Sequence, residues 1–246
     1  MPLEGKNAVI YGGAGAIGGA AARAFAASGA RVFAVEHTLV DALDEDAVTR
    51  HAAEVRERAG SIDICLNAVG LPLGSQGVPL VELAADAAVG AVSAYIRTNF
   101  VTAKAAALHM RETGGGVILA LSPPMARNPV ALSGPFGMAG AAVEGLVRQL
   151  AAELGAHGVR AVGMRLNGIP ETASRLGSHT AQMWGRAAER LGVPYERLLE
   201  QVGAGTFSGR PLTVRQVADV AVFLASDRAG GVTGTVVNVT GGAGVD

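Results

Sequence analysis

The chain has 246 residues, of which 50% are hydrophobic, and its formal net charge is −1. This length suits one sizeable α/β domain, and a near-neutral charge without a run of Lys or Arg argues against a nucleic-acid partner. Cys65 is the only cysteine, which excludes an intrachain disulfide and makes a reducing cytoplasm the expected compartment. We expect neither a secretion signal nor a membrane span, because the N-terminus lacks a basic segment followed by an apolar one and no apolar run reaches ~18 residues.

Short apolar runs alternate with stretches of helical periodicity along the chain. Buried strands are expected within 6–11, 31–36, 62–70, 116–122, 159–166 and 235–239. Helices are expected within 16–29, 44–60, 86–112, 137–157 and 214–226, and the polar stretch 172–207 is expected to be irregular. This alternation predicts a single Rossmann-like α/β domain, doubly wound around a parallel sheet, with its ligand site at the carboxyl ends of the strands.

A glycine-rich turn, "YGGAGAIG", follows the first strand and opens the first helix. Glycines there let the backbone approach a pyrophosphate, and the helix N-terminus offers free N–H groups and a positive dipole. Glu36 ends the second strand, where an acid would bind both ribose hydroxyls and repel a 2′-phosphate, which favours NAD over NADP. Two plainer alternatives stay open: the glycines serve close strand–helix packing, and Glu36 is a solvated carboxylate.

With these motifs the chain resembles the short-chain dehydrogenase/reductase family across nearly its whole length. Asn99 matches the family's helix asparagine, Ser122 its active-site serine, and the tail 209–242 is very close to the family pattern. Asn167 stands in place of the proline of the family's Pro-Gly segment, and Ala16 in place of its middle glycine. The resemblance implies NAD(H) as the cofactor, with weak or absent binding as the alternative, and these cofactor-binding positions: Gly12, Ala16, Ile17, Gly18, Glu36, Asp41, Asn67 and Thr172. No cluster of His, Cys or carboxylate residues has metal-ligand spacing, so we expect no metal.

The family's Tyr-x-x-x-Lys motif is replaced by Phe136 and Gly140. In the family this tyrosine passes a proton to or from the substrate oxygen, and the lysine lowers its pKa. A benzyl group and a glycine can do neither. Ser122 is expected to donate a hydrogen bond to a carbonyl or a developing oxyanion, and Asn99 to orient a water or the helix backbone. Alternatively, both are scaffold residues with satisfied hydrogen bonds.

Only seven residues, "HTLVDAL", separate Glu36 from the helix expected near Asp44, whereas a crossover between parallel strands takes at least about ten to twelve. The family places a further helix and strand here. We therefore expect six strands, with the usual third strand and its preceding helix missing. The strand at 31–36 would become an exposed sheet edge, which the loop 37–43 or a partner subunit is expected to cover. Dinucleotide binding would be weakened, because the adenosine pocket loses a wall.

The stretch at about 172–210 corresponds to the family's substrate-covering lid. His179, Met183, Trp184 and Tyr195 could shape an apolar pocket there with one group that titrates near pH 7. His179 is thus a candidate catalytic residue, although a lone lid histidine can equally face solvent. Glu171 is another possible base. Helices 86–112 and 137–157 are apolar enough to form the pair through which the family makes homodimers and homotetramers.

Three functions follow from these observations. The first is an enzyme that keeps the fold and pocket but performs non-redox chemistry on a small carbonyl-type metabolite, such as enolisation, dehydration, epimerisation or cyclisation. The second is an NAD(H)-dependent oxidoreductase with a substitute proton donor. The third is a non-catalytic binding or partner subunit.

Overall fold

A computed structural model describes residues 1–70, 75–174 and 180–245. Its centre is a six-stranded sheet in which every pairing is parallel, in the order β2-β1-β3-β4-β5-β6. The predicted doubly wound α/β fold is therefore confirmed. The strands are β1 (Asn7–Tyr11), β2 (Arg31–Val35), β3 (Ile64–Asn67), β4 (Gly116–Ser122), β5 (Val159–Leu166) and β6 (Thr235–Val239).

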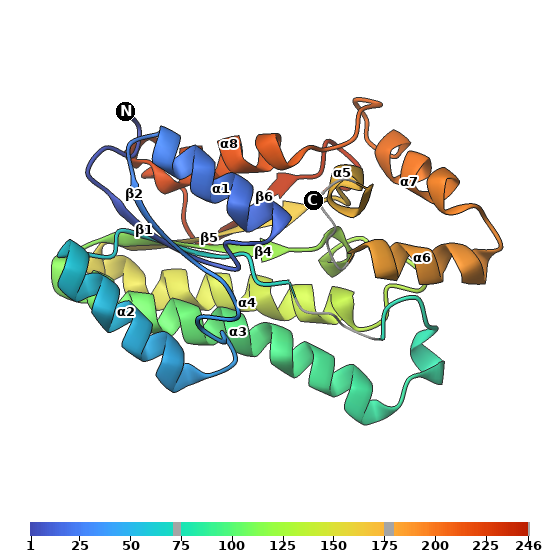
Figure 1. The fold of residues 1–246 in the computed structure, drawn as a ribbon, viewed down its shortest axis with the longest axis horizontal. Coiled ribbons are helices and arrows are strands. Elements are labelled where there is room, and N and C mark those ends of the chain that lie inside the picture. The colour runs from blue at the N-terminus through green and yellow to red at the C-terminus, as the bar shows by residue number, and fades with distance from the viewer. Residues whose placement is uncertain (71–74, 175–179, 246) are drawn as a thin grey trace.

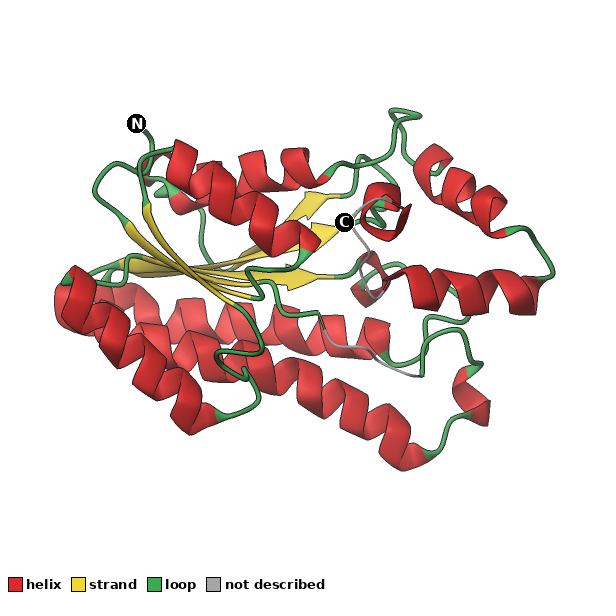
Figure 2. Cartoon of the chain, viewed as in Figure 1, coloured by secondary structure: helices red, strands yellow, loops and turns green. Residues whose placement is uncertain are grey.

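Helices cover both faces of the sheet (Figures 1 and 2). One face carries α1 (Ala16–Ala27) and α8 (Val214–Ala225), and the other carries α2 (Glu45–Ala59), α3 (Ala85–Thr113) and α4 (Phe136–Leu154). Beyond the carboxyl ends of the strands lie α5 (Pro170–Ser174), α6 (Thr180–Leu191) and α7 (Tyr195–Ala204). Short 3₁₀ turns occur at Leu80–Glu82, Pro124–Ala126, Gly155–His157 and Asp227–Ala229.

The helix ends follow the expected local signals. The Asp44 side chain accepts a hydrogen bond from the Ala47 N–H at 3.0 Å at the start of α2, and Gly60 ends that helix with φ +86°. Thr213 and Gln216 form a reciprocal capping box at the start of α8. None of the described helices is long and apolar enough to cross a membrane.

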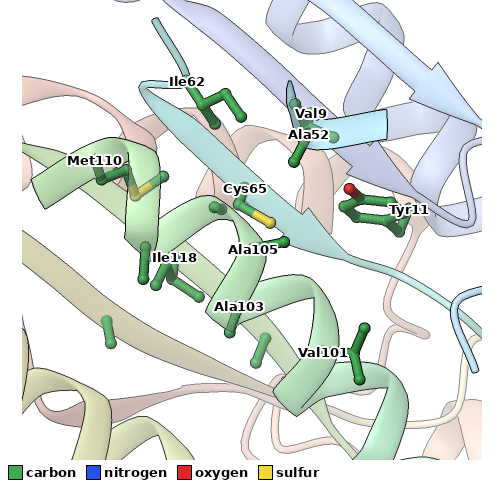
Figure 3. Packing of buried hydrophobic residues seen from close by; sticks show 14 of the residues in the cluster. Val9, Tyr11, Ala52, Ile62, Cys65, Val101, Ala103, Ala105, Met110 and Ile118 are labelled. Atoms are coloured by element: carbon green, nitrogen blue, oxygen red, sulfur yellow. The ribbon is translucent and has the colours of Figure 1, made fainter. Parts of the chain in front are cut away.

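The core between the sheet and helices α2 and α3 is tightly packed (Figure 3). Cys65 lies within it beside Ile118 and Ala105, and only 1% of its surface is exposed. Burial raises the pKa of the Cys65 thiol to about 12. A thiol held protonated in this way is a packing residue rather than a nucleophile.

The short connection after β2 is confirmed. Residues 37–43 are all described, and they form turns without a helix or strand, so β2 is the edge of the sheet and pairs with β1 alone among the described strands. The guanidinium groups of Arg31 and Arg58 lie 5.0 and 5.8 Å from the centre of the Phe33 ring, and Val40 of the loop packs against the same core as Phe33. The loop thus covers part of the apolar face at this edge.

The expectation of an irregular stretch at 172–207 is wrong for its described part, which contains α6 and α7. These helices bury a small apolar cluster of their own, centred on Met183 and Trp184 and completed by Leu198 and Leu199. The polar composition concealed this pattern, because each helix has only one narrow apolar side.

Candidate active site at the carboxyl edge of the sheet

A cavity of about 640 Å³ opens at the carboxyl ends of the strands. Its walls come from segments far apart in the sequence, and most of the lining surface is apolar. The lining includes residues of the glycine-rich turn, 36–37 and 40–43 after β2, 68–70 after β3, 121–125 at the end of β4 and beyond it, 166–169 at the end of β5 and beyond it, and Tyr95, Thr98, Phe136, Thr172, Thr180, Met183 and Trp184. This is the position at which doubly wound sheets bind ligands.

The glycine-rich turn forms one end of the cavity. Gly12 has φ +81°, and a Cβ there would lie 2.5 Å from the Ala68 carbonyl oxygen. A Cβ on Gly18 would lie 2.2 Å from the Gly12 carbonyl oxygen. Close packing thus requires both glycines. Ala16 and Ile17 line the cavity at the start of α1. The N-cap of this helix is Gly15, which has no side chain to cap it, so backbone N–H groups are left at this end for a ligand.

Two acidic residues stand on the loop beside that turn. Glu36 is exposed and lines the cavity directly after β2. Asp41 also lines it, and its Oδ1 accepts a hydrogen bond from the Leu43 N–H at 2.9 Å and lies 3.6 Å from His37 Nδ1. A carboxylate at the strand end and uncapped helix N–H groups are the donor and acceptor set that a dinucleotide requires, so these residues fit its adenosine and pyrophosphate parts.

The two asparagines lie behind the cavity wall. Asn67 donates to Thr102 Oγ1 at 3.0 Å and accepts from the Val69 N–H at 3.0 Å, and so fixes the turn after β3. Asn99 donates to the Tyr95 carbonyl oxygen at 3.0 Å, while its buried Oδ1 has no hydrogen-bond partner among the described residues. Both border a separate void of about 10 Å³ instead of the large cavity.

The other end of the cavity holds Phe136 and a phenol that the sequence reasoning missed. The ring of Tyr95 stands edge-on to that of Phe136, with centroids 5.8 Å apart and planes at 79°. The Tyr95 hydroxyl donates to the Leu121 carbonyl oxygen at 3.3 Å, and burial raises its pKa to about 12. Tyr95 is therefore a neutral hydrogen-bond donor at neutral pH. A signal existed, because Tyr95 lies one helical turn before Asn99.

Ser122 also lines this end, at the last position of β4. Its hydroxyl donates to Glu144 Oε1 at 2.8 Å, and the Arg165 guanidinium binds both oxygens of the Glu144 carboxylate, with Nε–Oε1 and Nη2–Oε2 distances of 2.8 and 3.0 Å. Exposed fractions are 2% for Ser122, 6% for Glu144 and 5% for Arg165. The structure thus gives the Ser122 hydrogen, which we expected to reach the substrate, to a carboxylate behind it.

Gly140 lies at a close approach between α4 and the turn after β4. A Cβ there would be 2.6 Å from Pro123 Cδ and 3.0 Å from Ala126 Cβ. Separations below 3.0 Å are not tolerated without movement. The backbone of α4 at this residue therefore packs directly on the Pro123 ring, and no side chain fits.

Three predicted site residues remain, namely Thr172, Glu171 and His179. Thr172 lines the cavity, and its hydroxyl donates to the Ile169 carbonyl oxygen at 2.8 Å and lies 3.2 Å from Thr180 Oγ1. Glu171 accepts a hydrogen bond from the Val214 N–H at 2.6 Å at the start of α8. His179 lies outside the described residues.

The sheet and its helices form a Rossmann-type fold, and the cavity lies where such folds bind their ligands. Residues 12–244 match the family model described as enoyl-(acyl carrier protein) reductase. (+)-Borneol dehydrogenase 1 of Salvia officinalis is 31% identical over an alignment covering 98% of this chain and 94% of its own. The chain therefore belongs to the short-chain dehydrogenase/reductase family, whose members act on small metabolites and generally bind NAD(P)(H).

Two further comparisons show a similar sequence and a similar fold, respectively. A (+)-cis,trans-nepetalactol synthase of Nepeta racemosa is 29% identical, with 98% of this chain and 94% of the synthase covered. The crystal structure of levodione reductase superposes with a TM-score of 0.84, covers 98% of each chain and is 23% identical. The latter shows that the fold is shared.

Proposed function

We propose that this protein is an enzyme that transforms a small carbonyl-type metabolite without ordinary hydride transfer, by enolisation, dehydration, epimerisation or cyclisation. One observation carries the proposal: the end of the cavity that holds Tyr95 and Phe136, here called the reaction end, is lined by Phe136 where the family has its tyrosine. Behind it, Gly140 stands where the family has its lysine, and Pro123 packs so closely against this glycine that a Cβ would lie 2.6 Å from Pro123 Cδ. The site is thus built around this glycine.

Tyr95 is the proposed carbonyl-binding group. Its hydrogen bond to the Leu121 carbonyl oxygen, at 3.3 Å, is longer than the usual 2.5–3.0 Å for O–H···O, so exchanging that acceptor for a substrate oxygen costs little. A hydrogen bond from a neutral phenol stabilises negative charge that develops on the oxygen. When a base removes the neighbouring C–H proton, the C–H electron pair forms the enol double bond and the carbonyl π pair moves onto that oxygen. We propose His179 as the base.

The end of the cavity formed by the glycine-rich turn, here called the dinucleotide end, fits a dinucleotide, and this supports a second candidate function. The uncapped start of α1, with Ala16 and Ile17, would hold the pyrophosphate, Glu36 the ribose hydroxyls, Asp41 the adenine and Thr172 the carboxamide. A bound NAD(H) would supply a hydride carrier. An NAD(H)-dependent oxidoreductase with Tyr95 or His179 as substitute proton donor is therefore the alternative, and a non-catalytic partner subunit is the third.

The names of two relatives correspond to the two main candidate functions. One is named a dehydrogenase and another a synthase, so neighbours of this chain carry names of both kinds. We further propose that 172–210 acts as a lid and that the exposed sides of α3 and α4 join copies of the chain into a homodimer or homotetramer.

Carbon–hydrogen exchange separates the candidates. Purified protein is incubated in D₂O with a panel of terpenoid and polyol-derived ketones, with and without NAD⁺ or NADH, and is followed by NMR and by absorbance at the NADH band. The proposal predicts deuterium uptake beside the carbonyl, or dehydrated or cyclised product, without net NADH change. Product formed in equal amount to the NADH consumed would establish the alternative, and neither signal from the panel would favour the partner subunit.

A further inference from the structure

The hydrogen-bond direction at Ser122 is set by two residues that do not line the cavity. The register of the sheet pairs Ser122 of β4 with Arg165 of β5, so their side chains leave the same face, and Glu144 of α4 lies against both. An arginine is always charged and carries only donors, and an ionised carboxylate carries only acceptors. The Glu144 carboxylate therefore cannot donate a hydrogen bond to the Ser122 oxygen, and can only accept one from the Ser122 hydroxyl.

The single hydroxyl hydrogen of Ser122 is committed to the protein interior. Its acceptor is Glu144 Oε1 at 2.8 Å, and the next nearest is the Pro123 carbonyl oxygen at 3.4 Å. The bond to a carboxylate is the shorter and the charge-assisted one, and such bonds are roughly twice as strong as neutral ones. The lone pairs of the Ser122 oxygen are then left to face the cavity, where they can accept a hydrogen bond.

Stability alone does not explain a buried ion pair at this position. Burying two charges costs desolvation, and an apolar pair of similar size often serves stability as well. β5 is otherwise apolar around Arg165, and α4 presents Val143 and Val147 on the same buried side as Glu144. Through Glu144, the pair contacts Ser122, which is a side chain of the cavity wall.

We infer that Glu144 and Arg165 are positioning residues that make Ser122 a hydrogen-bond acceptor, so that the substrate presents a hydroxyl group to it. Together with Tyr95 as donor, which rests on the proposed function, this narrows the substrate to a hydroxycarbonyl compound: the carbonyl oxygen faces Tyr95 and the hydroxyl faces Ser122. Dehydration and epimerisation both use such a hydroxyl. A simple ketone could accept a hydrogen bond from Tyr95 but would leave the Ser122 lone pairs without a donor, and would bind more weakly.

The first test measures binding by ligand-observed NMR with two probes of nearly equal shape, cyclohexanol and cyclohexanone. The native protein is expected to prefer the alcohol by about tenfold, the worth of one hydrogen bond to a group that is otherwise left unpaired. In Glu144→Gln the side-chain amide can donate to Ser122 and release its hydrogen toward the cavity, so the preference should fall to about one or invert. A ratio near one in the native protein, a preference for the ketone, or no binding of either probe overturns the inference.

Controls show whether Glu144 acts through Ser122. Ser122→Ala should abolish the preference, and Glu144→Gln added to Ser122→Ala should change nothing further. Glu153→Gln makes the same substitution on the exposed side of α4, where the carboxylate bonds Gln149, and should keep the native ratio. An effect of Glu144→Gln that persists without Ser122 would contradict the positioning role.

Neutron diffraction on the native protein gives a test that needs neither a ligand nor a variant. The deuteron on Ser122 Oγ is expected on the line to Glu144 Oε1, and a deuteron directed into the cavity would refute the inference. The outcomes are separable from those of the proposed function: alcohol preference without carbon–hydrogen exchange overturns the function alone, and exchange without alcohol preference overturns the inference alone.

Discussion

The two ends of the cavity differ in what they are made of. The dinucleotide end is built from backbone: a turn in which carbonyl oxygens leave no room for a Cβ on Gly12 or Gly18, and the uncapped start of α1. The reaction end is built from side chains, with Tyr95, Ser122 and Phe136 on three different elements. A backbone site changes only if the fold changes, whereas a side-chain site can be rewritten residue by residue. The family's glycine-rich turn is accordingly recognisable here, whereas the side chains at the reaction end have to be compared with the family one by one.

The largest effect is expected from Gly18→Ala, which attacks the backbone end. The added Cβ would lie 2.2 Å from the Gly12 carbonyl oxygen, a backbone atom with little room to yield. We expect a loss of about 3 kcal/mol in the free energy of unfolding, the upper part of the range for overpacking, and loss of dinucleotide binding, measured by thermal denaturation and NADH fluorescence. Gly90→Ala in α3, with no atom within 4 Å of the new Cβ, is the matched control. Unchanged NADH binding in Gly18→Ala would break the comparison.

Tyr95→Phe tests the side-chain end. It removes one hydroxyl and keeps the edge-on contact with Phe136, so stability should change little. The rate of the reaction should fall about 10²-fold, since one oxyanion donor contributes about 2.7 kcal/mol to transition-state stabilisation. Measurement of kcat and of the denaturation midpoint on the same sample separates the two effects, and full activity in Tyr95→Phe would remove the phenol from the mechanism.

Restoring the family's pair should fail. Phe136→Tyr combined with Gly140→Lys places a Cβ 2.6 Å from Pro123 Cδ, and we expect a loss of about 2 kcal/mol in stability and no gain in NADH-dependent ketone reduction. Gly145→Ala, on the same helix with nothing within 4 Å, should instead stabilise by about 0.5–1 kcal/mol. A stable double variant with ketone reductase activity would show that the reaction end differs from the family in only two side chains.

Glu36→Gln tests whether this carboxylate selects the cofactor at the dinucleotide end. The neutral side chain is a weaker acceptor for the ribose hydroxyls and no longer repels a 2′-phosphate, so affinity for NADH should fall about tenfold and the discrimination against NADPH should shrink. Titration with both cofactors measures it. Equal affinities for NADH and NADPH in the native protein would show that the carboxylate plays no such part.

The smallest effect concerns pH and His51, whose Nδ1 lies 3.2 Å from the Tyr11 hydroxyl at the end of β1. Burial lowers the pKa of His51, with a partly opposing contribution from Glu54. The unfolded chain, with a pKa near ~6.5, therefore binds more protons than the folded one just below that pH. Stability should be full above about pH 6.5 and be lost as pH falls through the folded-state pKa.

His51→Gln should reduce the difference between the denaturation midpoints at pH 5 and pH 7.5, because glutamine keeps an acceptor for Tyr11 and does not titrate. His157→Gln, at an exposed position, should leave that difference unchanged. Equal pH dependence in native protein and His51→Gln would contradict the assignment.

The missed residues share a physical cause. Arg165 sits at a buried position of a mostly apolar strand and Glu144 on the buried side of a mostly apolar helix, so each sequence position alone indicated a charge that needs a partner. Nothing in the order of residues says that the two meet, because 21 positions separate them. The same is true of Pro123 and Gly140, whose contact gives the glycine its reason.

The sequence by itself determined the six strands and the helices that flank the sheet, the glycine-rich turn, the short connection at 37–43 and the presence of Phe136 and Gly140 in α4, because these depend on local periodicity and on which side chains exist. Only the tertiary structure decided that Asn67 and Asn99 lie behind the cavity wall, that Tyr95 faces Phe136, and that the Ser122 hydrogen points to Glu144. Direction and distance between side chains on different elements are set by sheet register and helix packing, which the linear pattern does not contain.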